Sequence, residues 1–169
     1  QLTGTTTSEG AQLWKSDGTE QGTVMVKDLG GEGGFGSLPH RLTVAPNGSV
    51  YFLADDGGFS GDDLYITDGT EQGTNLVYDK SRQGAIRGLV MVGNILMFAI
   101  DGDLWKTDGT TSGTQLVKEI NLGSNGGILD SDHSVDIGGE LLFFGHQGRN
   151  WNQDTWQIWK SDGTDSGTF

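Results

Sequence analysis

Three apolar runs recur along the chain, and each follows a pair of turn-forming residues. The runs occupy 50–54, 95–99 and 141–145, and the pairs before them are Asn47-Gly48, Gly93-Asn94 and Gly138-Gly139. Two-residue turns of this kind join antiparallel strands, because a positive φ at their centre matches the twist of the strands. The runs are apolar at consecutive positions, which indicates burial on both faces. Each run is therefore predicted to be an inner strand sandwiched between neighbouring sheets.

An eleven-residue string occurs four times between and around these runs. The copies are LWKSDGTEQGT at 13–23, LYITDGTEQGT at 64–74, LWKTDGTTSGT at 104–114 and IWKSDGTDSGT at 158–168. The intervals between their aspartates, 51, 40 and 54 residues, bracket the roughly 40–50 residues of one four-stranded propeller blade. The first complete unit reads as four strands, at 42–45, 49–55, 63–67 and 74–78, and no segment shows a sustained helical period.

These repeats predict an all-β fold, a β-propeller-like array of four-stranded antiparallel blades. About three complete blades with partial blades at the ends are expected, in a single repeat domain over 1–169. The predicted divisions are a partial blade at 1–36, blades at 37–80 and 81–120, and an incomplete blade at 121–169. The first unit supplies only third and fourth strands. We therefore expect part of a longer propeller, or a subunit that completes its sheet against another chain.

The repeated string is predicted to be a tight turn between the third and fourth strands. Its aspartate can cap backbone N–H groups in an Asx-turn, and its glycine can take a positive φ. These structural pairs are Asp17-Gly18, Asp68-Gly69, Asp108-Gly109 and Asp162-Gly163. The aromatic residues before them, Trp14, Tyr65, Trp105 and Trp159, are expected to pack against the next blade. A catalytic or metal-binding ring of aspartates is the alternative, but an active site needs residues that differ in role, whereas these are copies.

The four strings resemble the ELWxxDGT repeat, a family of large bacterial surface and secreted proteins, and the resemblance covers nearly the whole chain. Here Gln12, Asp63, Asp103 and Gln157 replace the leading Glu of the family pattern. The turn also resembles the structural Asp-box of sialidase propellers, S/T-x-D-x-G. The resemblance implies propeller-like blades, a scaffold with no particular reaction, and an extracellular or cell-surface location in bacteria.

The composition narrows the range of partners. Only 33% of the 169 residues are hydrophobic, below the roughly 45–50% of globular proteins, so the core is expected to be thin. Lys plus Arg number 10 against 23 for Asp plus Glu, a net charge of -13, which repels phosphate backbones and anionic lipids. Nucleic acid is therefore not expected as a partner, and neither is membrane insertion, because the longest apolar stretch, 88–100, is shorter than the ~20 residues that span a bilayer. Calcium or a neutral glycan fits the charge better.

Two acidic groups are candidate calcium sites. The loop 54–63 carries Asp55, Asp56, Asp62 and Asp63, and carboxylate oxygens on a flexible turn are the ligands that Ca²⁺ requires. Asp130, Asp132 and Asp136 form a second group. Neither follows the order of an EF-hand, and the alternative is a solvated acidic surface. There is no cysteine, and therefore no disulfide and no thiolate metal site.

The last unit carries an insertion at 146–156 that the other units lack. Trp151 offers an aromatic platform, and polar groups surround it in the sequence. The candidate ligand-binding residues are Arg149, Trp151, Asn152, Gln153, Asp154 and Trp156. Insertions in repeat proteins often carry the specific function, so these residues predict contact with a sugar or polar ligand. The alternative is a loop that covers the edge of the blade.

No motif for an enzymatic reaction emerges from the sequence. The G-x-G-x-x-G match at 31–36 lacks the following helix of a dinucleotide site, and no nucleophile elbow is present. The sequence therefore predicts a non-enzymatic scaffold or protein-interaction module that binds other blades or neighbouring chains. Two alternatives are a carbohydrate-binding lectin that uses the insertion, and a fragment of a propeller hydrolase whose catalytic residues lie outside this chain.

Overall fold

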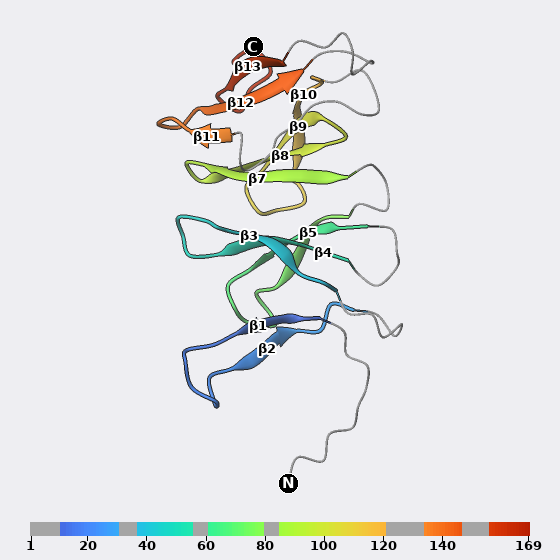
Figure 1. Ribbon diagram of the computed structural model, residues 1–169, viewed down its shortest axis with the longest axis vertical. Helices are drawn as coiled ribbons and strands as arrows, with labels where there is room; N and C mark the ends of the chain where they lie inside the picture. The colour runs from blue at the N-terminus through green and yellow to red at the C-terminus, as the bar shows by residue number, and fades with distance from the viewer. Residues whose placement is uncertain (1–10, 31–36, 56–60, 80–84, 121–133, 147–155) are drawn as a thin grey trace.

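The computed structural model describes residues 11–30, 37–55, 61–79, 85–120, 134–146 and 156–169 (Figure 1). These residues form thirteen β-strands and no helix, and therefore none long and apolar enough to cross a bilayer. The strands are β1 (Leu13–Lys15), β2 (Val24–Lys27), β3 (His40–Val44), β4 (Val50–Ala54), β5 (Asp63–Thr67), β6 (Asn75–Tyr78), β7 (Ile86–Val92), β8 (Ile95–Ile100), β9 (Asp103–Thr107), β10 (Gln115–Lys118), β11 (Ser134–Asp136), β12 (Leu141–His146) and β13 (Trp156–Ser161).

The strands form four antiparallel sheets in chain order. The N-terminal sheet is β1-β2, the second is β3-β4-β5-β6, the third is β7-β8-β9-β10, and the last is β11-β12-β13. Figure 1 shows them one above another along the long axis, from the N-terminal sheet at the bottom to the last sheet at the top. The expected all-β class and four-stranded antiparallel unit are confirmed, and the described sheets form an open stack.

Two four-stranded sheets are complete among the described residues, whereas about three were expected. In the last sheet the place of the fourth strand is taken only by Phe169, which exchanges both backbone hydrogen bonds with Lys160, at 2.9 and 3.0 Å. One predicted turn also differs. Gly93-Asn94 and Gly138-Gly139 are two-residue loops, but Asn47-Gly48 belongs to a longer loop closed by bonds from Gly48 N to Ala45 O and from Ala45 N to Ser49 O.

The core consists of apolar layers between the sheets, and the second strand of each complete sheet contributes to two layers. In β4, Phe52 and Ala54 pack towards Leu13 of the N-terminal sheet, while Tyr51 and Leu53 pack towards the third sheet. Side chains alternate between the faces of a strand, so a run that is buried on both faces must be apolar at every position. The prediction of inner, sandwiched strands is confirmed for β4 and β8, whereas among the described residues β12 is packed by a neighbouring sheet on one face only.

Three of the four aromatic residues before the aspartates pack against the preceding sheet, so the expectation that they face the next one is wrong. Tyr65 lies in the layer shared with the N-terminal sheet, and Trp159 in the layer shared with the third sheet. Trp105 meets Tyr78 of the second sheet edge to face, with ring centroids 5.7 Å apart. Strand alternation explains this, because the leucine one position earlier, such as Leu104, already faces the next sheet.

Candidate functional site: the aspartate turns

The repeated string folds into the same turn in all four sheets, here named the aspartate turn: residues 17–23, 68–74, 108–114 and 162–168. In the third sheet, Asp108 Oδ1 accepts hydrogen bonds from the backbone N of Thr110, at 2.9 Å, and from its hydroxyl, at 2.7 Å. The Thr110 hydroxyl in turn accepts a bond from Gly113 N at 2.9 Å. The first glycine of each turn has φ between 85° and 97°. The predicted Asx-type turn with a left-handed glycine is therefore confirmed.

A second set of hydrogen bonds closes the base of each turn. The Thr107 hydroxyl, at the end of β9, lies 2.8 Å from the Thr114 hydroxyl and accepts a bond from Gly109 N at 3.0 Å. Thr114 donates to the carbonyl of Thr110. The equivalent hydroxyl pairs are Ser16 with Thr23, Thr67 with Thr74, and Ser161 with Thr168, each at 2.7 Å. Each turn is thus an internally satisfied unit that joins the third strand to the fourth.

The second glycine of the turn has a role that the sequence analysis missed. Gly22, Gly73, Gly113 and Gly167 do not have positive φ values. A Cβ atom at any of these four positions would instead lie well under 3.0 Å from the aspartate carboxylate of the same turn. The carboxylate fills the space of the absent side chain, so glycine is required here by close packing. The recurrence of glycine five residues after each aspartate was the available signal.

The turns of the second and last sheets also receive lysine side chains from the preceding sheet. Lys15 Nζ donates to the carbonyl of Gly69 at 2.6 Å, and Lys106 Nζ donates to that of Gly163 at 2.7 Å. From the fourth strands, Lys27 reaches the carbonyl of Thr74 at 2.8 Å and Lys118 that of Thr168 at 2.7 Å. The aspartate turns are therefore contact points between sheets as well as turns within them.

The interface between the second and third sheets uses other residues at these positions. Ile66 occupies the position of Lys15 and Lys106, and a Cβ on Gly109 would meet Ile66 Cδ1 and the Tyr51 hydroxyl at 3.0 Å. Burial raises the pKa of Tyr51, and the charge of Asp108 raises it further. The turn of the third sheet is thus held by apolar and aromatic contacts in place of lysine.

The turn aspartates do not differ in their surroundings as catalytic carboxylates do. In each case the neighbouring threonine hydroxyl lowers the pKa of the aspartate, and the backbone N–H of the same threonine lowers it further. All four carboxylates are exposed. Within the described part of the chain, no three or more His, Asp or Glu side chains are placed to hold a metal ion. The geometry therefore supports a structural role for these residues.

The residue that precedes the repeated string has a structural use too. Gln12 Oε1 accepts a hydrogen bond from the backbone N of Leu29 at 3.3 Å, and Asp103 Oδ1 accepts one from the backbone N of Ile120 at 3.1 Å. Both side-chain oxygens thus accept a hydrogen bond from the segment that follows the fourth strand. An amide and a carboxylate serve equally here, because only an acceptor is needed.

The described aspartates among the calcium candidates of the loop 54–63 have different surroundings. Asp62 lies 3.4 Å from His40 Nε2, Asp63 is buried in β5, and the backbone N of Asp55 donates to the carbonyl of Ser37. Asp56 lies outside the described residues, as do Asp130 and Asp132. Asp136, from the second acidic group, accepts a bond from Gly139 N at 2.7 Å. Calcium binding at either group stays a prediction.

The ligand-binding candidates of the insertion fall almost entirely outside the described residues. Arg149, Trp151, Asn152, Gln153 and Asp154 belong to the segment 147–155, and of Trp156 only the backbone is described, as the first residue of β13. The glycine-rich segment 31–36 lies outside the described residues as well. Sugar binding by the insertion therefore stays a prediction.

Comparison of the chain with protein-family models, with curated proteins and with solved structures finds no match.

Proposed function

We propose that this protein is a non-enzymatic scaffold of the ELWxxDGT type, located outside the bacterial cell or on its surface, whose sheets dock further sheets of the same kind. The four aspartate turns support this proposal, since their polar groups are used within the turn or in contacts between sheets. Copies of one turn, repeated along a stack, suit architecture better than a reaction that needs residues in different roles.

We further propose that the stack is an arc of a β-propeller. Between neighbouring sheets, the most extensive backbone contacts among the described residues are those of the first strands, β3 with β7 and β7 with β11. Such convergence is expected when blades are arranged around an axis with their first strands innermost. Each sheet is also a four-stranded or shorter meander in chain order, as a propeller blade is.

The observation that carries the docking function is the outer face of the last sheet. Phe144 and Ile158 occupy the positions of Leu53 and Leu64 in the second sheet, which are fully buried against the third sheet. In the last sheet these side chains are 43% and 64% exposed. Burying a side chain of this size stabilises an interface by about 1.5–3 kcal/mol. The face therefore has the apolar residues of a stacking face, and Ile158 is exposed on it.

The partner that fits this face is another sheet with an aspartate turn. Lys160 is equivalent to Lys15 and Lys106, which donate to the first glycine of the following turn, but here it pairs with Glu140 at 2.7 Å. The N-terminal sheet offers the complementary face. Its Trp14 is 58% exposed, whereas the equivalent Tyr65 and Trp159 are buried against a preceding sheet. A sheet from the same protein or from a neighbouring chain can fill either place.

Sedimentation and light scattering of the 169-residue chain over a range of concentrations test this proposal. We expect reversible association that Ile158→Asp weakens strongly, because the new carboxylate would be buried at the interface. Val44→Asp is the matched control, since Val44 is 66% exposed but lies on the edge strand β3. Circular dichroism verifies that both variants fold. A chain that stays monomeric, or an equal effect of both variants, would contradict the docking function.

A further inference from the structure

The two arginines among the described residues differ from the lysines in having no anionic or carbonyl partner there. Each described lysine reaches an oxygen: Lys15, Lys27, Lys106 and Lys118 bind carbonyls, and Lys160 binds a carboxylate. The guanidinium groups of Arg41 and Arg87 make no such contact with any described residue, although a guanidinium carries five donors. In a chain of net charge -13, these are the cations left available to a ligand in the described part.

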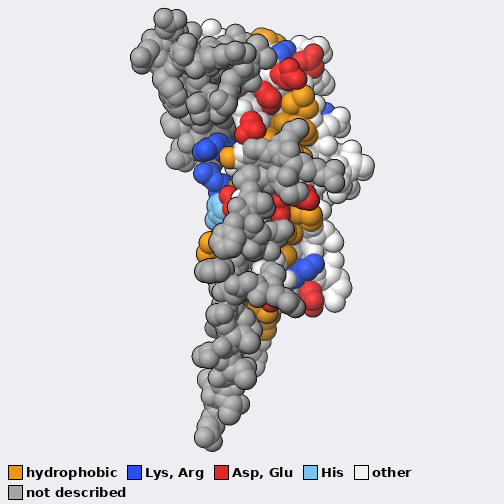
Figure 2. Space-filling view, turned by 90° about the vertical axis from the view of Figure 1, so that its right-hand side faces the viewer, with side chains coloured by type: hydrophobic (Ala, Val, Ile, Leu, Met, Phe, Trp, Pro, Cys, Tyr) orange, Lys and Arg blue, Asp and Glu red, His pale blue; other side chains and the backbone are white. Residues whose placement is uncertain are grey.

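Both arginines lie on first strands of adjacent sheets. Arg41 is on β3 and Arg87 is on β7, and these strands are in contact. His40 pairs with Leu53 in the second sheet, and Arg87 pairs with Ala99 in the third. Arg87 therefore occupies the position in the third sheet that His40 occupies in the second. Figure 2 shows basic side chains and a histidine close together along the left-hand side of this view, with acidic side chains beside them.

The backbone at Arg41 is strained. Its φ is 52°, in the left-handed region, at a bulge where the pairing of β3 with β4 shifts register. The third sheet has the same bulge, and there the equivalent residue is Gly88, with φ of 60°. A side chain in this conformation costs about 1–2 kcal/mol that glycine does not. An arginine at the strained place, where glycine serves in the next sheet, points to a use for its side chain.

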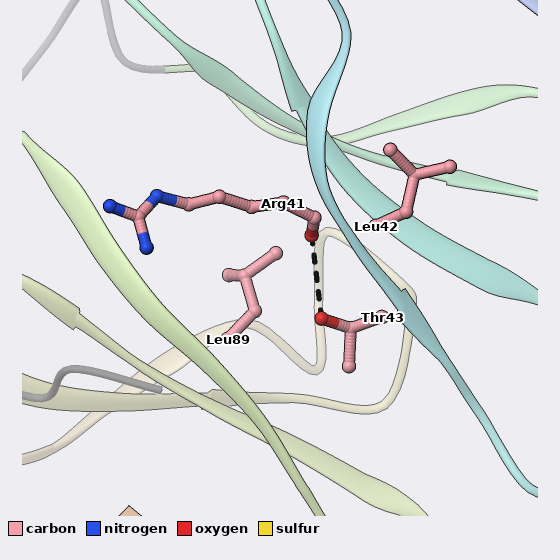
Figure 3. A pocket seen from close by; sticks show the side chains of 4 residues that line it. All are labelled: Arg41, Leu42, Thr43 and Leu89. Carbon is pink, nitrogen blue, oxygen red and sulfur yellow. Dashed lines mark hydrogen bonds between the residues drawn. The ribbon is translucent and has the colours of Figure 1, made fainter. Parts of the chain in front are cut away.

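A pocket opens beside this arginine. It has a volume of about 130 Å³ and is lined by Arg41, Leu42 and Thr43 of β3 and by Leu89 of β7. Figure 3 shows the Arg41 side chain extended past Leu89, which is 5% exposed and belongs to the core. The Thr43 hydroxyl makes only a long bond, 3.4 Å, to the carbonyl of Arg41. The lining thus combines two leucines, a threonine and an arginine, with space for roughly four water molecules.

We propose that this pocket binds a small organic carboxylate, with its charge on Arg41 and its short apolar stem against Leu89. The planar guanidinium matches a carboxylate in two parallel hydrogen bonds. A single negative charge suits the surroundings, because the net charge of the protein repels polyanions. The volume admits a carboxylate with a few methylene groups. The pocket lies between two sheets of this chain, so it does not depend on the proposed docking of further sheets.

Titration of the chain with butyrate, followed by NMR of the Leu89 methyl groups and the Arg41 Nε–H group, tests the proposal. We expect saturable shifts with a dissociation constant of about 1–10 mM, as fits so small a ligand. Butyramide, which has the same shape without the charge, should give no shifts, and sulfate, which lacks the stem, should bind more weakly.

Two variants complete the design. Arg41→Gly keeps the left-handed backbone and removes the guanidinium, so it should fold and weaken butyrate binding about tenfold or more. Val135→Asp changes the net charge by the same amount at an exposed position of the last sheet and should leave binding unchanged. The proposal is overturned if butyrate gives no saturable shift, if Arg41→Gly binds as the parent does, or if sulfate binds as tightly as butyrate.

Discussion

Replacing the second glycine of one aspartate turn, in the variant Gly113→Ala, probes the packing that shapes all four turns. The added Cβ would overlap the carboxylate of Asp108. Either the carboxylate moves away from Thr110, whose backbone N–H and hydroxyl donate hydrogen bonds to it at 2.9 and 2.7 Å, or the backbone of the turn shifts. We expect a loss of about 2–3 kcal/mol, in the upper part of the usual range of about 1–3 kcal/mol for forced overpacking. Alanine in a compatible site would instead stabilise by about 0.4–1 kcal/mol.

The loss should be measured by thermal unfolding and by urea titration. For a chain of 169 residues, 1 kcal/mol corresponds to about 2–4 °C, so the midpoint should fall by about 5–10 °C. The double variant Asp108→Ala with Gly113→Ala separates the cause. Without the carboxylate the added methyl group has space. The double variant should therefore lose less stability than the sum of the losses in the two single variants. Unfolding of Gly113→Ala at the parent temperature, or strict additivity in the double variant, would refute the packing explanation.

Three further outcomes are expected. Arg41→Gly should be more stable than Arg41→Ala by about 1 kcal/mol, and should unfold at a higher temperature, because φ at this position is 52°; equal stability would contradict the strain. Because hydrogen bonds lower the folded-state pKa of the four turn aspartates below 3.8, they contribute stability above that pH, which is lost as the pH falls through their folded pKa values. Melting curves at decreasing pH should therefore show a decline below about pH 4 that Asp108→Asn reduces, and a decline of equal size in this variant would count against it. Calcium added after chelation should raise the unfolding temperature of the chain but not of Asp62→Asn; no shift at millimolar calcium, with magnesium as the control, would remove the acidic loop from consideration.

The local structure of the repeat could be predicted because its causes lie within a few residues of sequence. An aspartate, a glycine and a threonine in succession are enough to form the Asx-type turn, as at Asp108, Gly109 and Thr110. Apolar residues at consecutive positions identified β4 and β8 as strands buried on both faces. Both signals report short-range geometry, which a sequence pattern contains.

Contacts between sheets could not be predicted in the same way. Strand alternation determines which residues share a face, but not which neighbour that face meets, so Trp159 was assigned to the wrong side. The hydrogen bond from Lys106 to Gly163 joins residues 57 positions apart, and no local sequence pattern predicts it. The space that the carboxylate of Asp108 takes beside Gly113, and the meeting of β3 with β7 beside Arg41, likewise exist only once the chain has stacked its sheets. The sequence alone thus determined the four-stranded unit and its turn, and the tertiary structure decided how the units are joined, since those contacts depend on the positions of whole sheets.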